Sequence, residues 1–217
     1  MTTHPIHRVR AGEASLDGDL TVPGAATGVV LFAHGSGSSR HSPRNRSVAS
    51  ALHQRGLATL LADLLTPGDA AARPAPGRDP RFDIELLAGR LIGLIDWTGH
   101  HPETAHLPLG LFGASTGAAA ALVAAAARPD EVRAVVSRGG RPDLAGPALA
   151  QVTAPTLLLV GERDTAVLDL NEQARQALPA PAEMRIIPGA THLFEEEGAL
   201  DAVAGEAARW FTTHLHS

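Results

Sequence analysis

The residues best suited to covalent chemistry lie in the pentapeptide GASTG, residues 113–117, which follows an apolar run and precedes a string of alanines. A serine on a sharp strand-to-helix turn can act as a nucleophile, because flanking glycines let the chain turn without a Cβ clash and the hydroxyl then projects above the sheet. The ordinary alternative is a serine that caps an alanine-rich helix. Since a cap does not require glycine two residues away on both sides, we favour Ser115 as a nucleophile.

A serine hydroxyl becomes a good nucleophile only when a positioned base takes its proton. The segment VGERD places Asp164 just after an apolar run, and GATHLF places His192 after the next one. In open α/β sheets the site forms at the carboxyl ends of the strands. We therefore predict a triad of Ser115, His192 and Asp164. Glu162, two residues before Asp164, is the weaker candidate for the acid.

Acyl transfer also needs hydrogen-bond donors for the oxyanion. One is expected from the backbone N–H of Thr116, directly after the nucleophile, and the other from the loop after the first parallel strand. That loop reads AHGSGSSR, residues 33–40. We assign the second donor to the N–H of Ser36, with Gly35 as the neighbouring alternative.

Four arginines are expected near the same edge of the sheet. Arg138 and Arg141 follow a predicted strand, while Arg40 and Arg44 follow the oxyanion loop. A guanidinium can fork onto a carboxylate or phosphate, so Arg138, Arg141 or Arg40 could bind an anionic substrate. The alternative is that these side chains are solvated or hold loops together.

The elements that must position these residues alternate along the chain in the manner of a parallel sheet covered by crossover helices. A hairpin turning at Asp17-Gly18 is expected at one edge. The most loop-like segment is 66–82, and residues 139–154 leave room for one short helix, which excludes an inserted cap domain. We predict a single domain over residues 1–217. Strands are predicted at 28–34, 57–63, 107–113, 132–138, 155–161 and 182–188, and helices at 42–56, 83–99, 115–130, 166–179 and 198–215.

The four segments FAHGSG, GASTG, VGERD and GATHLF, in this order, resemble those of a small, capless α/β-hydrolase of the dienelactone hydrolase branch. The resemblance implies a three-layer α/β fold with a mostly parallel eight-stranded sheet. It also implies a triad of Ser115, Asp164 and His192. Dienelactone hydrolases use a cysteine nucleophile, so the serine here favours a carboxylesterase. We expect hydrolysis of small ester or lactone substrates through an acyl-enzyme.

Composition narrows the possible partners. The chain has 217 residues, no cysteine and a net charge of −5. Thiol catalysis is excluded, nucleic acid is not an expected partner, and no segment reads as a leader or membrane span. We expect a cytoplasmic monomer or homodimer that needs no metal and no cofactor.

Three other functions stay open at this point. The same triad could transfer an acyl group to an alcohol or amine. The fold could serve as a non-catalytic binding protein. Finally, Gly35-Ser36-Gly37 with Asp63 after the next strand could form an NAD(P) site, although Arg40 occupies the position of the third glycine in that motif.

Overall fold

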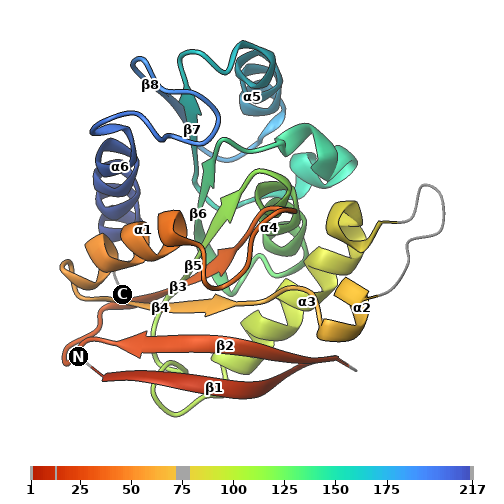
Figure 1. Ribbon diagram of the computed structural model, residues 1–217, viewed down its shortest axis with the longest axis vertical. Coiled ribbons are helices and arrows are strands. Elements are labelled where there is room, and N and C mark those ends of the chain that lie inside the picture. Colours follow the sequence, from red (N-terminus) through yellow and green to blue (C-terminus); the bar gives the residue numbers. More distant parts are fainter. Residues whose placement is uncertain (1, 13, 72–78, 216–217) are drawn as a thin grey trace.

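A computed structural model describes residues 2–12, 14–71 and 79–215 of the chain. Its centre is one eight-stranded sheet in the order β1-β2-β4-β3-β5-β6-β7-β8 (Figure 1). The strands from β4 to β8 run parallel, while β2 pairs antiparallel with both β1 and β4. The predicted α/β fold, with a mostly parallel sheet and an antiparallel hairpin at one edge, is therefore confirmed.

The inner strands are short and apolar because helices bury them on both faces. Every residue of β3, β4, β5 and β7 is buried. The strand bounds are β1 (Thr2–Ala11), β2 (Ala14–Val22), β3 (Gly28–Ala33), β4 (Leu57–Ala62), β5 (Leu109–Ala114), β6 (Val132–Arg138), β7 (Thr156–Gly161) and β8 (Ala182–Ile187).

The helices form two layers, one on each face of the sheet (Figure 1). One apolar cluster joins α1 and α6 to one face, and the other joins α3, α4 and α5 to the opposite face. Their bounds are α1 (Pro43–His53), α2 (Pro67–Ala71), α3 (Ile84–Thr98), α4 (Thr116–Ala127), α5 (Thr165–Ala177) and α6 (Ala199–His214), with short 3₁₀ segments η1 (Pro80–Phe82) and η2 (Pro142–Gln151).

The edge hairpin does not turn where the sequence suggested. Asp17 and Gly18 lie inside β2, where Gly18 pairs with Ile6 on one side and Ala62 on the other. The strands instead meet near Gly12, whose φ of 63° favours glycine. A Cβ on Gly18 would lie 3.1 Å from the Leu60 side chain, so this glycine provides close packing between strands and not a turn.

The connections follow the expected layout with one addition. The segment after β6 forms only η2, which bends at Gly146, so the described chain has no inserted cap there. The segment predicted as a loop, 66–82, begins with α2 and ends with η1, and residues 72–78 lie outside the described part. The carboxyl ends of β3, β5, β6 and β7 thus meet at one edge without a covering domain.

Candidate active site

Ser115 lies at the turn between β5 and α4. Its backbone has φ 53° and ψ −121°, a conformation that non-glycine residues rarely adopt. The Ser115 N–H donates to the carbonyl of Arg138 at 3.2 Å, and the Ser115 carbonyl accepts from Ala118 N–H at 3.1 Å. Although Ser115 is the N-cap residue that directly precedes α4, its side chain makes no capping hydrogen bond. The hydroxyl is thus not used to begin the helix.

Both glycines of GASTG are needed because the turn packs against neighbouring backbone. A Cβ on Gly113 would lie 2.4 Å from the Cα of Ala118. A Cβ on Gly117 would lie 2.2 Å from the carbonyl oxygen of Ala33, at the end of β3. Neither position can accept a side chain unless the backbone shifts, which explains the flanking glycines that a simple helix cap would not require.

His192 and Asp164 are joined by a hydrogen bond of 2.6 Å between Nδ1 and Oδ2. Asp164 follows β7 and begins α5, yet its side chain does not cap that helix. The carboxylate is 12% exposed and the imidazole 38% exposed. Glu162, the weaker candidate for the acid, instead accepts from the N–H of Gly189 at 2.7 Å, which holds the loop before His192.

The loop carrying His192 is anchored by Phe194, a role that the sequence did not suggest. Phe194 has φ 55° and is 1% exposed, and its N–H donates to the Thr191 carbonyl at 3.2 Å. A buried ring on such a turn fixes the position of the residue two places earlier. The only sequence signal was an aromatic residue two places after His192.

Ser115 and His192 line one cavity of about 270 Å³. The side chains and backbone of the oxyanion loop form one wall, and two arginines contribute to the lining. The described lining comprises Gly35, Ser36, Gly37, Ser38, Arg44, Ala114, Ser115, Arg138, His192 and Leu193. The structure therefore brings the predicted nucleophile, base and oxyanion loop to one place, with Asp164 behind the base.

The loop after β3 lies against the nucleophile turn. A Cβ on Gly35 would be 3.2 Å from both the Ala114 carbonyl oxygen and the Ser115 Cβ. Ser36 follows it on the cavity wall, and Thr116 is buried as the first residue of α4. The two predicted oxyanion donors thus flank Ser115, one from each segment.

His34 fixes this loop, and the sequence analysis did not assign it that role. Its Nε2 accepts the N–H of Leu64 at 3.0 Å, and its Nδ1 lies 3.0 Å from the carbonyl oxygen of Gly35. These partners suit a neutral ring that carries its proton on Nδ1. Burial lowers the pKa of His34 below its ordinary value, which keeps the ring neutral.

The arginines proposed for anion binding occupy different places. Arg138 lines the cavity with Ser115 and is 7% exposed. Arg141 forms a two-pronged pair with Asp143, with both N–O distances 2.8 Å, and is not among the cavity residues. Arg40 is paired with Asp63 and lies near Asp17 and Asp19.

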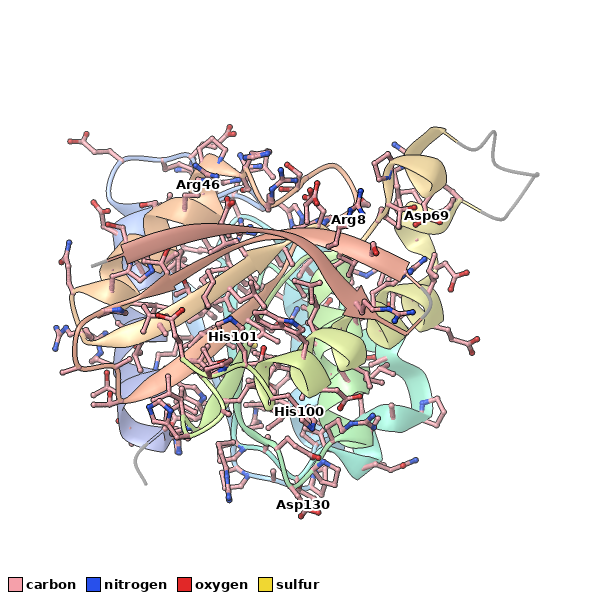
Figure 2. The ribbon with its side chains drawn as sticks, turned by 90° about the horizontal axis from the view of Figure 1, so that it is seen from below. Arg8, Arg46, Asp69, His100, His101 and Asp130 are labelled. Atoms are coloured by element: carbon pink, nitrogen blue, oxygen red, sulfur yellow. The ribbon has the colours of Figure 1, made fainter. Side chains whose placement is uncertain are left out.

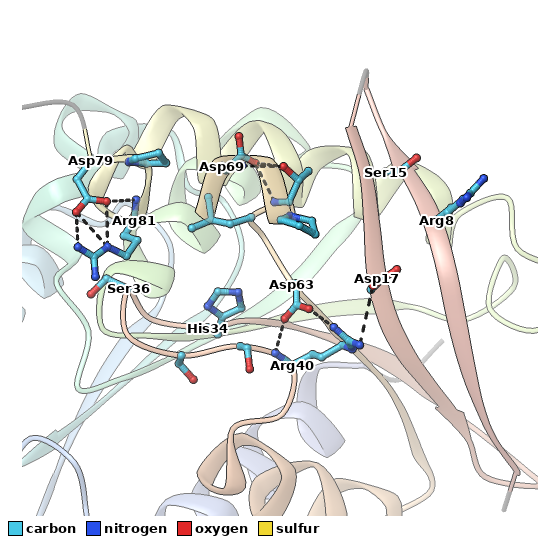
Figure 3. A pocket seen from close by; sticks show the side chains of 16 residues that line it. Arg8, Ser15, Asp17, His34, Ser36, Arg40, Asp63, Asp69, Asp79 and Arg81 are labelled. Atoms are coloured by element: carbon cyan, nitrogen blue, oxygen red, sulfur yellow. Dashed lines mark hydrogen bonds and ion pairs between the residues drawn. The ribbon is translucent and has the colours of Figure 1, made fainter. Parts of the chain in front are cut away.

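A second cavity of about 780 Å³ adjoins the first at Ser36 and Ser38 (Figure 3). Its charged groups are largely neutralised by one another, since Arg40 is bonded to Asp63 and Arg81 to Asp79. In an NAD(P) site Asp63 would accept a hydrogen bond from the ribose. In this structure its carboxylate is paired with Arg40 instead. His34 and Leu65 also line this cavity.

The described residues contain no group of three or more His, Cys, Asp or Glu side chains arranged to hold a metal ion. Figure 2 shows His100 and His101, in the turn after α3, away from Arg8 and Asp69, which border the larger cavity. Within the described residues no helix is both long and apolar enough to cross a membrane.

Comparison with known proteins shows the family to which the chain belongs. A family model described as an alpha/beta hydrolase domain matches residues 26–209. The chain belongs to the α/β-hydrolase family. This α/β-hydrolase is 56% identical to a dienelactone hydrolase from Anabaena variabilis, with a TM-score of 0.94 and 99% of each chain covered. The predicted resemblance to the dienelactone hydrolase branch is confirmed.

Two further matches define the limits of the comparison. The structure of Est1E from Butyrivibrio proteoclasticus has a TM-score of 0.78 at 16% identity over 96% of this hydrolase and 97% of that chain, which shows a common fold. A candidate phosphoribosyl transferase of Mycobacterium tuberculosis is 57% identical over 208 residues, or 96% of this chain. The match covers 46% of that protein, so this chain spans less than half the length of its curated relative.

Proposed function

We propose that this α/β-hydrolase is a serine hydrolase that cleaves carboxylic esters or lactones of small substrates through an acyl-enzyme. The observation that carries the proposal is the arrangement around one cavity. Ser115, free of any capping bond on a strained turn, shares this cavity with His192, whose Nδ1 is held 2.6 Å from Asp164. This arrangement supports the roles of nucleophile for Ser115, base for His192 and orienting acid for Asp164.

The mechanism follows from the protonation pattern of this arrangement. The carboxylate of Asp164 accepts the Nδ1–H of His192 and leaves the lone pair on Nε2 to take the hydroxyl proton of Ser115. The Ser115 oxygen attacks the substrate carbonyl, and the imidazolium then gives its proton to the leaving alcohol. Water, which gives a proton to His192, attacks the acyl-enzyme carbonyl, and the ester bond to Ser115 breaks as His192 returns that proton to the Ser115 oxygen and the acid is released.

The negative charge on the tetrahedral oxygen needs fixed donors. The proposed donors are the backbone N–H groups of Ser36 and Thr116, which come from the two segments flanking Ser115. The N-terminus of α4 adds a favourable dipole. A cavity of about 270 Å³ is slightly smaller than the usual range for drug-sized ligands, which supports a short acyl group or small lactone.

The test uses a fluorophosphonate probe and a panel of p-nitrophenyl esters of increasing acyl length. The wild-type protein is expected to be labelled and to prefer short chains. Ser115→Ala should abolish labelling and lower kcat by something like 10⁶-fold, the scale reported for removal of such a nucleophile. Circular dichroism on the same samples checks that the variant is folded.

Each alternative has its own outcome in this test. Folded wild-type protein that resists the probe would support a non-catalytic binding protein. Labelling combined with faster turnover when an alcohol is added as acceptor would support acyl transfer. NAD(P) binding in a titration would point to the loop at 35–37.

The name phosphoribosyl transferase belongs to a protein more than twice as long as the part matched, and that activity is not part of this proposal. The cytoplasmic location of the protein and its state as a monomer or homodimer remain predictions.

A further inference from the structure

The larger of the two cavities, of about 780 Å³, has no part in the proposed reaction. It shares Ser36 and Ser38 with the cavity of about 270 Å³ that contains Ser115 and His192. Figure 3 shows that its lining comes from the oxyanion loop, the β1–β2 hairpin, the segment after β4 and the turn at Asp79. Since Ser36 is also a proposed oxyanion donor, a group in the larger cavity can be joined directly to the carbonyl that Ser115 attacks.

The charges on this lining are balanced by ion pairs. Each of its four aspartates has an arginine nitrogen within 4.0 Å: Asp17 and Asp63 lie near Arg40, Asp69 near Arg90 and Asp79 near Arg81. Arg8 also lines the cavity, but it is exposed to solvent, where water and salt screen its charge. Within the described lining, a charged ligand therefore finds no buried opposite charge that lacks an ion-pair partner.

Hydroxyl groups and one carboxylate oxygen supply the hydrogen-bonding capacity that remains. A hydroxyl can both donate and accept. The lining contains the hydroxyls of Ser15, Ser36, Ser38, Ser39 and Thr66. Asp69 makes its bonds to Thr66 and Arg90 through Oδ2, so among the described residues its Oδ1 keeps its capacity to accept. The cavity thus offers donors and acceptors from several segments to one ligand.

The same lining disfavours a long hydrocarbon chain or an aromatic ring. Its described residues include no Phe or Trp, and the apolar residues among them are Leu65, Pro67 and Pro80. Sites for large apolar ligands are lined mainly by hydrophobic and aromatic side chains. The balance of charges and the number of hydroxyls favour a compact, neutral ligand that makes many hydrogen bonds.

We propose that the larger cavity binds the alcohol part of the substrate, and that this alcohol is a neutral polyol such as a sugar ring. This inference rests on the proposed function, in which the smaller cavity holds a short acyl group. A polyol forms an ester through one of its own hydroxyls, so it occupies the alcohol side of the bond. When the bond between the acyl carbon and the sugar oxygen breaks, His192 gives that oxygen a proton, and the free sugar leaves from the larger cavity.

The kinetic test compares acetate esters that share a ring and differ in the polar groups on it. Methyl 6-O-acetyl-α-D-glucopyranoside is paired with (tetrahydropyran-2-yl)methyl acetate, and methyl 5-O-acetyl-β-D-ribofuranoside with tetrahydrofurfuryl acetate. Released acetate is measured, and background hydrolysis with Ser115→Ala is subtracted. In at least one pair kcat/KM should be about tenfold or more higher for the sugar ester, since each hydrogen bond contributes roughly twofold to tenfold. Equal or lower values for the sugar ester in both pairs would overturn the inference.

Two variants locate this preference in the larger cavity. Asp69→Asn keeps one oxygen for the bonds from Thr66 and replaces the other by a donor, so it should lower the ratio within the preferred pair roughly threefold to tenfold. Ser15→Trp fills space in the larger cavity, because Ser15 lines this cavity and not the smaller one. It should lower kcat/KM for the sugar ester relative to that for ethyl acetate.

Matched controls make the same exchanges at exposed residues that line neither cavity. These are Asp130→Asn and Ser50→Trp, which should leave both ratios at their wild-type values. A variant that is only less well folded loses activity toward all the esters equally and leaves the ratios unchanged. Ratios that neither Asp69→Asn nor Ser15→Trp changes would mean that the larger cavity does not bind the sugar.

A binding measurement separates this inference from the proposed chemistry. Calorimetric titration of Ser115→Ala with the two sugar esters needs no turnover. Binding of a sugar ester that is weakened by adding Ser15→Trp supports the polyol site even if the wild type cleaves no ester. Tighter binding of glucose 6-phosphate or glucosamine contradicts it, because the expected ligand is neutral. If the fluorophosphonate probe labels Ser115 and ethyl acetate is hydrolysed while neither sugar ester binds, the polyol site fails and the serine hydrolase proposal stands.

Discussion

At the scale of single residues, the proposed nucleophile Ser115 has a backbone conformation that lowers the stability of the fold. Its φ of 53° and ψ of −121° are comfortable for glycine and costly for any residue with a Cβ, at roughly 1–3 kcal/mol. The same strain exposes the hydroxyl above the sheet. If the strain serves the reaction, removing the Cβ should stabilise the fold and abolish the activity.

We therefore predict that Ser115→Gly is more stable than Ser115→Ala. The expected difference is about 1 kcal/mol, after part of the relieved strain is offset by the greater flexibility of glycine in the unfolded chain, or about 2–4 °C in Tm for a protein of this size. Both variants lack the hydroxyl, so the comparison isolates the backbone. Thermal and urea unfolding measure the difference. An alanine variant as stable as the glycine variant would mean that the turn is not strained.

At the scale of elements, the strand ends hold the site together, and His34 is the link between two of them. It joins the loop after β3 to Leu64, just beyond β4, through a hydrogen bond that only the unprotonated Nε2 can accept. Burial lowers the pKa of His34, against smaller opposing effects from the hydrogen bond to the Gly35 carbonyl and from the charge of Asp63. The oxyanion loop is thus expected to loosen in acid.

The sign of the pH dependence follows from this lowered pKa. Below about pH 6.5 His34 binds a proton in the unfolded chain but not in the folded state. The free energy of unfolding therefore falls as the pH drops from about 6.5 toward the folded pKa, and the full contribution of His34 is present above about pH 6.5. His34→Gln keeps an acceptor for Leu64 but cannot titrate. Urea unfolding between pH 7.5 and 5.5 should show a shallower loss in this variant than in the wild type.

His53 and His214, whose pKa values are also lowered by burial, contribute to the wild-type slope in the same direction. His53 and His214 are present in both proteins, so the difference between wild type and His34→Gln contains only the contribution of His34. Identical slopes in the two proteins would show that the His34 ring is not held neutral. If kcat/KM of His34→Gln is also lower than that of the wild type, the substitution affects the oxyanion loop and not only the stability of the fold.

Local patterns predicted the elements well because their signals are local. Apolar runs placed the six parallel strands within two residues at each end, and the glycines of GASTG correctly marked a strand-to-helix turn at Ser115. The hairpin turn was misplaced because Gly18 is required by packing against Leu60, which a dipeptide does not reveal. Which arginine is neutralised by an acid could not be predicted, since Arg40 meets Asp63 only after β3 and β4 pair.

At the scale of the whole molecule, the sheet leaves no boundary at which the chain could divide. Its strands are hydrogen-bonded continuously from β1 to β8, and each helix layer contacts several of them. The edge hairpin β1–β2 is also packed against the rest of the fold. Helix α3 approaches β1 so closely that a Cβ on Gly93 would lie 2.4 Å from the Cα of Ala11. We expect residues 1–217 to form one cooperative unit, without the remainder that its longer relatives contain.

The two tryptophans of the chain test this prediction because they report on opposite layers. Trp97 lies in α3 and Trp210 in α6. Fluorescence of Trp97→Phe and Trp210→Phe should give unfolding curves of the same shape, each coincident with circular dichroism of that variant. The calorimetric enthalpy should equal the van't Hoff enthalpy, at about 150 kcal/mol from about 0.7 kcal/mol per residue. If the fluorescence of Trp97 changes at a lower temperature or denaturant concentration than that of Trp210, the β1–β2 edge with α3 unfolds as a separate unit.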